Sequence, residues 1–127
     1  MPNVLLVEDN QTFRMAVLAA LQRRGYAVTY AANGSEALKI LETQRPDIVI
    51  LDLVMPDMDG LTVLRRMRLS PALADVPVIV LAGMISENQM LRAKELGAES
   101  LIKCCVTMKE LCQRIGERLQ ATAVAAY

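Results

Sequence analysis

The sequence has few aromatic residues and no excess charge of either sign. Its 127 residues include one phenylalanine, three tyrosines and no tryptophan, and 14 basic side chains balance 14 acidic ones. Proteins that bind nucleic acid or anionic membranes usually present an excess of basic charge. The composition therefore argues against direct binding of nucleic acid or of a charged membrane surface.

Long apolar segments are also missing. No run approaches the roughly 20 apolar residues that a helix needs to cross a bilayer. The first residues, MPNVLLVEDN, have no basic stretch before the apolar ones, so they do not resemble a signal peptide. Three cysteines, two of them adjacent, do not make the paired framework of a disulfide-rich secreted domain. We therefore expect a cytoplasmic protein with reduced thiols.

Short apolar runs alternate with segments of helical spacing along the whole chain. The apolar runs predict strands at 3–8, 26–31, 47–52, 76–81 and 99–103, and the helical spacing predicts helices at 11–24, 36–44, 61–69, 86–97 and from 107 onward. Asn33, Gly34 and Ser35 predict a turn before the second helix. Because buried strands alternate with helices, the sequence predicts one α/β domain over residues 1–127, with a parallel sheet covered on both faces.

Acidic residues follow two of the predicted strands. Glu8 and Asp9 come directly after the first strand, and Asp52 ends the third. Ligands of open parallel sheets bind beyond the carboxyl ends of the strands, where three carboxylates would repel one another and attract a cation such as Mg²⁺. For Asp9 alone, capping of the next helix by Asp9 or Asn10 is the simpler interpretation. Three acids at one edge favour a metal site.

Four segments carry a more specific pattern: VLLVEDN at 4–10, PDIVILDLVMPDMDG at 46–60, VPVIVL at 76–81 and AKELGAESLI at 93–102. Together they resemble the receiver domain of bacterial two-component response regulators over nearly the whole chain. The resemblance implies that family's α/β fold, a flavodoxin-like, doubly wound sheet of five parallel strands in the order 2-1-3-4-5 with five helices.

The resemblance also implies a role for each acid. Asp52 matches the residue that accepts a phosphoryl group from a histidine kinase, Glu8 and Asp9 match the acidic pair that holds Mg²⁺, and Val54 matches the position whose backbone carbonyl also binds the metal. Mg²⁺ allows a carboxylate to attack an anionic phosphoryl donor. The implied function is a signal-transduction receiver, not an enzyme, that controls an output domain or partner protein.

Three positions depart from the family pattern. Ala82 stands where receivers carry the threonine or serine of the switch, and Leu101 stands for the switch aromatic. A gap-free alignment on the preceding Gly-Ala pair puts Cys104 in the slot of the switch lysine and leaves Lys103 one residue early. A one-residue slip turns a strand side chain to the opposite face. We therefore expect Lys103 to point away from the acids, and to act as a substitute cation only if a bulge turns it back.

The adjacent Cys104 and Cys105 are compatible with a redox sensor or a soft-metal site, but they lack the CxxC spacing of zinc sites. The simpler interpretation is that both cysteines are small apolar side chains that fill space and have no chemical role. Cys112 falls on the apolar stripe of the last predicted helix and is expected in the core.

Three functions follow from these patterns. The first is a phosphorylated receiver served by a histidine kinase or phosphotransfer protein, with a homodimer through the fourth helix, fifth strand and fifth helix as one form of output. The alternative is an atypical receiver that acts as a phosphorylation-independent interaction module. A small phosphatase ranks last, because it would need a second acid two residues after Asp52, where Val54 stands.

Overall fold

A computed structural model of the chain describes residues 1–125, in which five strands alternate with five helices. Their bounds are β1 Asn3–Val7, α1 Gln11–Arg23, β2 Ala27–Ala31, α2 Gly34–Leu41, β3 Ile48–Asp52, α3 Gly60–Leu69, β4 Val78–Ala82, α4 Glu87–Glu95, β5 Glu99–Ile102 and α5 Met108–Ala125. Within the described residues, no helix is both long and apolar enough to cross a membrane.

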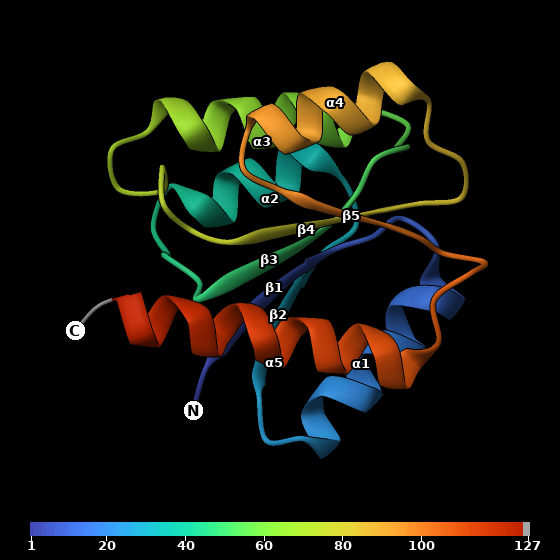
Figure 1. The fold of residues 1–127 in the computed structure, drawn as a ribbon, viewed down its shortest axis with the longest axis vertical. Helices are drawn as coiled ribbons and strands as arrows, with labels where there is room; N and C mark the ends of the chain where they lie inside the picture. Colours follow the sequence, from blue (N-terminus) through green and yellow to red (C-terminus); the bar gives the residue numbers. More distant parts are fainter. Residues whose placement is uncertain (126–127) are drawn as a thin grey trace.

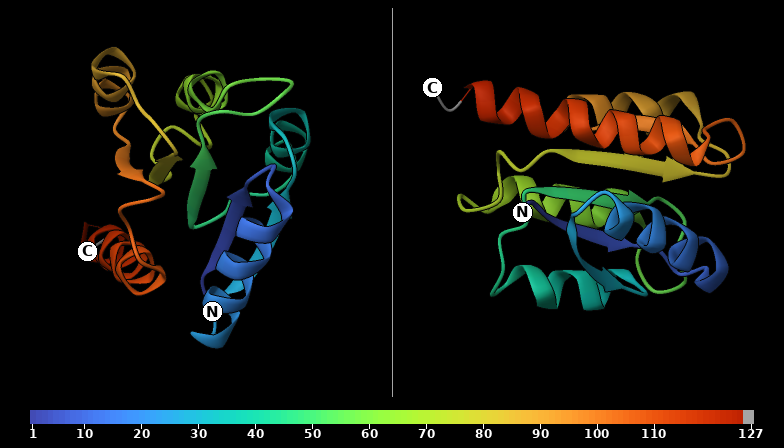
Figure 2. Two further views of the ribbon diagram at one scale, coloured as in Figure 1. Left: turned by 90° about the vertical axis from the view of Figure 1, so that its right-hand side faces the viewer. Right: turned by 90° about the horizontal axis from the view of Figure 1, so that it is seen from below.

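The strands form one parallel sheet in the order β2-β1-β3-β4-β5. The arrowheads of β1, β3 and β4 point the same way in the right-hand view of Figure 2. The predicted fold class and strand order are thus confirmed. From β1 the chain goes first to β2 on one side and then to β3 on the other side. The strand order therefore reverses between the carboxyl ends of β1 and β3, and open sheets bind ligands at such a point.

Helices cover both faces of the sheet: α2, α3 and α4 lie on one face, α1 and α5 on the other (Figure 1). Alternate residues of β1 serve the two layers, since Leu5 and Val7 pack in the core on the first side and Val4 and Leu6 in the core on the second. A strand that is buried on both faces reads as a continuous apolar run, which is why β1 and β3 could be recognised in the sequence.

Side-chain caps fix where the helices begin. Asn10 caps α1 by accepting a hydrogen bond from the Phe13 amide at 2.8 Å, so Asp9 is not the cap. Ser86 forms the predicted capping box with Gln89 at the start of α4. The predicted turn at residues 33–35 is wrong: Asn33 caps a helix that already begins at Gly34.

The loop from β3 to α3 passes very close to the end of β3. The Gly60 amide donates to the Leu53 carbonyl at 2.8 Å, and a Cβ at Gly60 would overlap the backbone carbonyl oxygen of Asp52. Backbone atoms cannot move aside as a flexible side chain can. Gly60 therefore allows this loop to return to the strand end that presents Asp52.

We expect Gly60→Ala to lower the free energy of unfolding by about 1–3 kcal/mol, because the added methyl group forces the loop away from β3. Gly83→Ala is the matched control, since a Cβ there meets no atom within 4 Å. Urea denaturation measures both variants. Equal stability of the two would show that the loop does not approach Asp52 as closely as described.

Candidate functional site

Three acidic side chains meet at the carboxyl end of the sheet. β1 and β3 are neighbours, with Val7 opposite Leu51, so the residues that follow in register lie side by side. Carboxylate oxygens of Glu8, Asp9 and Asp52 all lie within 4.8 Å of one another. Glu8 and Asp52 are buried, with exposed fractions of 1% and 3%, whereas Asp9 is exposed to solvent. The structure thus brings together the acids that the sequence singled out.

The environment of the cluster shifts the pKa values of Asp52 and Asp9. Burial, together with repulsion from Glu8, raises the pKa of Asp52 to about 7, against the pull of Lys103. Burial also works to raise the pKa of Asp9, but hydrogen bonding with Asp52 and Glu8 outweighs it and lowers that pKa. Three ionised carboxylates are therefore unfavourable in this cluster without a further cation.

Lys103 lies among the acids. Its ammonium nitrogen is 2.6 Å from Glu8 Oε1 and 3.3 Å from Asp52 Oδ2. Burial alone would lower the pKa of Lys103, but contact with Glu8 and attraction to Asp52 raise it above its usual value. One ammonium thus offsets part of the negative charge of the cluster.

The expectation that Lys103 points away from the acids is wrong, and no bulge is needed to explain why. The pairing of β4 with β5 is continuous from Ile79 opposite Glu99 to Ala82 opposite Ile102, and the Lys103 amide then donates to the Ala82 carbonyl at 2.8 Å. The gap-free alignment put Cys104 in this place, but the structure puts the ammonium of Lys103 beside Glu8 and Asp52. The register of β5 is set by its bonds to β4.

This correction moves the neighbouring assignments by one residue. Lys103, not Cys104, occupies the lysine slot, and Cys104 is exposed. The residue three positions before the lysine is then Ser100 instead of Leu101. Leu101 packs against the core beside α1 and α5. The switch aromatic is still absent, but Ser100 now holds its place.

Two of the remaining predicted positions flank Asp52. Ala82 ends β4 and is fully buried, and its methyl group offers no hydrogen-bond donor, so that departure from the pattern stands. Val54 is 66% exposed, and its amide donates to Asp52 Oδ1 at 3.3 Å. The backbone at Val54 therefore lies against the carboxylate of Asp52.

Two residues of α1 contribute to the site and were not predicted. The ring of Phe13 lies 4.9 Å from the Lys103 ammonium nitrogen, and Arg14 Nη1 donates to the Glu8 carbonyl at 2.9 Å. The Arg14 guanidinium also lies over the ring of Tyr30, at 5.0 Å. Phe13 and Arg14 both lie in the first turn of α1, and no motif in the sequence indicated these contacts.

Comparison with known proteins decides the family. The family model described as the response regulator receiver domain matches residues 4–116 of this chain. The chain belongs to this family. The family is one of signalling domains in two-component systems, and the comparisons do not favour the alternative of a phosphorylation-independent interaction module.

Curated relatives of this receiver are longer proteins. It is 36% identical over 115 residues to the transcriptional regulatory protein AfsQ1 of Streptomyces coelicolor, covering 91% of this chain and 50% of AfsQ1. It is 33% identical over 119 residues to the response regulator MprA of Mycolicibacterium vanbaalenii, covering 94% of this chain and 51% of MprA. The receiver spans about half the length of each.

Solved structures agree on the fold of this receiver over almost its whole length. The chemotaxis protein CheY4 of Vibrio cholerae is 30% identical, with a TM-score of 0.84 and coverage of 92% of this chain and 98% of CheY4. The receiver domain of the Francisella response regulator 1452 is 26% identical, with a TM-score of 0.87 and coverage of 96% and 99%.

Proposed function

We propose that this receiver accepts a phosphoryl group on Asp52 in an Mg²⁺-dependent reaction. The observation that carries the proposal is the arrangement at the carboxyl end of the sheet: the buried Asp52 lies beside Glu8 and Asp9, with the Lys103 ammonium 3.3 Å from its carboxylate. A histidine kinase or phosphotransfer protein is the proposed donor. Residues 1–127 are proposed to form a single receiver domain.

The donor set of the acidic cluster fits Mg²⁺. Three carboxylates and one ammonium leave a surplus of negative charge, and burial together with repulsion from Glu8 raises the pKa of Asp52. Oxygen ligands without nitrogen or sulfur are those that Mg²⁺ prefers. We propose Glu8, Asp9, Asp52 and the backbone carbonyl of Val54 as the residues that hold it.

Each residue of the site has a separate role in phosphoryl transfer. The Asp52 carboxylate is the nucleophile, and a bound Mg²⁺ supplies positive charge that offsets the anionic donor. Lys103 contributes a second positive charge next to the attacking oxygen. Ala82 contributes no hydroxyl to the phosphoryl group, so the switch would depend on Lys103 more than on the end of β4.

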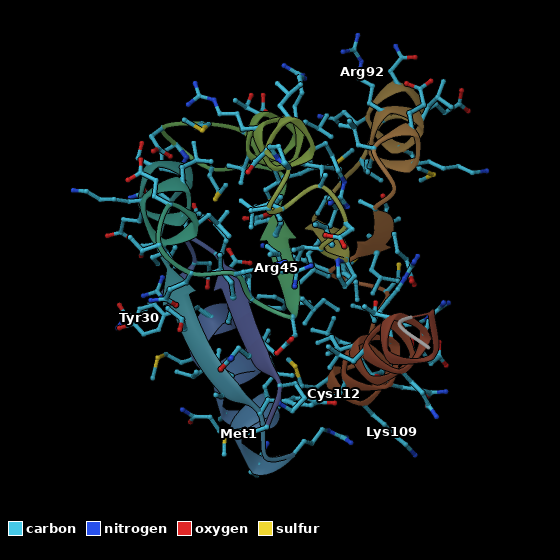
Figure 3. All side chains as sticks on the ribbon, turned by 90° about the vertical axis from the view of Figure 1, so that its left-hand side faces the viewer. Met1, Tyr30, Arg45, Arg92, Lys109 and Cys112 are labelled. Atoms are coloured by element: carbon cyan, nitrogen blue, oxygen red, sulfur yellow. The ribbon has the colours of Figure 1, made fainter. Side chains whose placement is uncertain are left out.

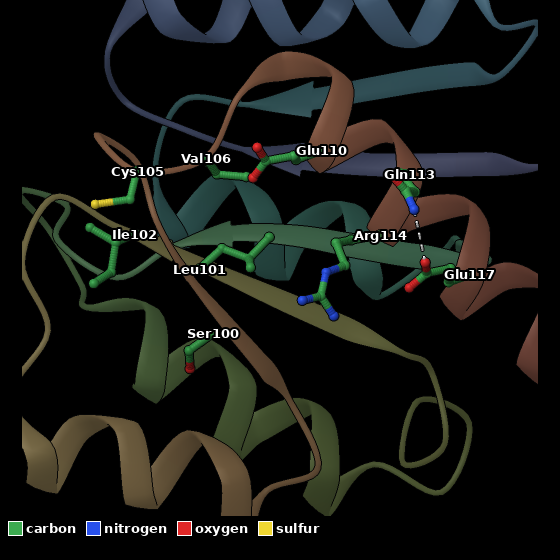
Figure 4. A pocket seen from close by; sticks show the side chains of 9 residues that line it. All are labelled: Ser100, Leu101, Ile102, Cys105, Val106, Glu110, Gln113, Arg114 and Glu117. Atoms are coloured by element: carbon green, nitrogen blue, oxygen red, sulfur yellow. Dashed lines mark hydrogen bonds between the residues drawn. The ribbon is translucent and has the colours of Figure 1, made fainter.

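The proposed output runs through the face formed by α4, β5 and α5, either to an output domain or partner protein or to a second copy of this chain. A groove of about 590 Å³ lies between β5 and α5 and is lined by Leu101, Val106 and Arg114 among others (Figure 4). Leu91 of α4 is 55% exposed. A cytoplasmic location is proposed because all three cysteines are free thiols.

Treatment with acetyl phosphate and Mg²⁺ should give one phosphoryl adduct per chain, on Asp52, detected by intact-mass spectrometry. Asp52→Asn should lose the adduct because an amide cannot act as the nucleophile, and chelation of Mg²⁺ should reduce the yield in wild type. Asp59→Asn is the matched control: Asp59 is an exposed helix cap, and asparagine caps equally well.

The control variant should be phosphorylated like wild type. Equal yields in wild type and Asp52→Asn would move the acceptor to another residue. Wild type that stays unmodified with Mg²⁺ present would overturn the proposal and support the phosphorylation-independent module.

A further inference from the structure

Two thiols lie together on the turn between β5 and α5. Cys104 and Cys105 are both exposed, and their sulfur atoms are 3.6 Å apart. The amides of Cys105 and Val106 both donate to the Ile102 carbonyl, at 3.0 and 3.1 Å, and so hold the turn in place. In Figure 4 the Cys105 sulfur points away from Leu101 and the rest of the groove. The pair is therefore open to a thiol-reactive ligand.

The pair is separate from the acidic cluster. Lys103 directs its ammonium to Glu8 and Asp52, while Cys104, the next residue, is exposed. The third cysteine cannot join the pair without disrupting the core, because Cys112 is 3% exposed and lies on the side of α5 that faces the sheet (Figure 3). Any atom that bridges the pair therefore has the sulfurs of Cys104 and Cys105 as its two protein ligands.

The spacing of the sulfurs favours one bridging atom over a direct bond. Cα atoms of adjacent residues lie about 3.8 Å apart, whereas disulfides usually need about 4.4–6.8 Å. A disulfide here would be strained. Two sulfurs bonded at about 2.3 Å to one pyramidal atom, with an angle of about 100° between the bonds, lie about 3.5 Å apart, close to the 3.6 Å of Cys104 and Cys105.

We propose that Cys104 and Cys105 form a dithiol site for trivalent arsenicals of the type R–As(OH)₂. Two As–S bonds form and two As–O bonds break, and the two thiol protons leave with the two hydroxyl groups as water. No oxidant is needed. The organic group fills the third position on arsenic, so two protein ligands suffice, whereas structural zinc sites need four and the sequence contains no histidine to help supply them.

The protonation of Cys105 supports this choice of ligand. The hydrogen bond with Cys104 raises the pKa of the Cys105 thiol, so it stays protonated at neutral pH. Oxidation by peroxide requires a thiolate, and a raised pKa disfavours it. The arsenical reaction removes the thiol proton as water, so a protonated Cys105 remains a suitable ligand.

Phenylarsine oxide, which is R–As(OH)₂ in water, tests the site by intact-mass spectrometry with the whole chain. Wild type should bind one arsenical that survives excess glutathione, a monothiol, and is removed by dimercaptopropanol, a dithiol. Cys104→Ser and Cys105→Ser should each bind on the order of 100-fold more weakly, because a single thiol loses the advantage of two linked bonds. Circular dichroism confirms that each variant is folded.

Two further variants make the result decisive. Cys112→Ser keeps the pair and should bind like wild type, and Asp52→Asn should also bind like wild type because the site does not depend on the proposed phosphorylation. An adduct that glutathione removes from wild type, or tight binding that persists in Cys104→Ser or Cys105→Ser, would overturn the proposal. Loss of binding in Cys112→Ser would do so as well.

Discussion

Lys103→Met should lower the free energy of unfolding of this receiver by about 2–4 kcal/mol at pH 8 in the absence of Mg²⁺. The ammonium contacts Glu8 Oε1 at 2.6 Å and Asp52 Oδ2 at 3.3 Å, and both carboxylates are buried. Removing one partner leaves buried charges of like sign without compensation. Methionine keeps an apolar stem of similar length beside Phe13, so the loss reports mainly on charge. Urea denaturation measures it.

Mg²⁺ should restore more stability to Lys103→Met than it adds to wild type. The variant no longer places an ammonium beside the proposed metal ligands, so the metal should bind it about tenfold more tightly, a difference of about 1.4 kcal/mol. Lys109→Met is the control, because Lys109 is an exposed lysine in the first turn of α5 that points away from the sheet (Figure 3). If both variants are equally stable, Lys103 does not pair with the acids in solution.

The fold was largely predictable because its signals are local. A parallel strand that is covered on both faces leaves a short apolar run, and the helices between such runs show their own spacing. The strand order came from the resemblance to receivers. The error at Asn33 has a physical reason: asparagine favours turns and helix starts through the same hydrogen bonds to nearby amides, so sequence alone did not separate the two.

The candidate site was predictable where it depends on strand ends and not where it depends on register. Glu8 and Asp52 lie where their strands stop, so their meeting follows from the sheet. The direction of Lys103 depends on how β5 pairs with β4, and residue counting from Gly97 does not establish that pairing. The contact of Phe13 with Lys103 depends on how α1 packs, which no motif records.

Asp52→Asn should have the opposite effect to Lys103→Met and stabilise the receiver in the absence of Mg²⁺. The pKa of Asp52 is raised from 3.8 to about 7 by burial and by Glu8, a shift equivalent to about 4 kcal/mol when the group is ionised. An amide removes this charge but does not reproduce every hydrogen bond of a protonated carboxyl group. We therefore expect a gain of about 2–4 kcal/mol at pH 8.

The pH dependence of this gain identifies its cause. Well below pH 3.8, Asp52 is protonated in both the folded and the unfolded chain, so Asp52→Asn should gain no stability over wild type. Between about pH 4 and 7 the unfolded chain releases the proton first, wild type loses stability, and the gain should grow. Above pH 7 it should be constant. Saturating Mg²⁺ should reduce the gain by stabilising wild type more than Asp52→Asn. A gain that is equal at pH 4 and pH 8 would mean that Asp52→Asn acts through packing. It would also mean that the ionised carboxylate of Asp52 does not destabilise the folded chain.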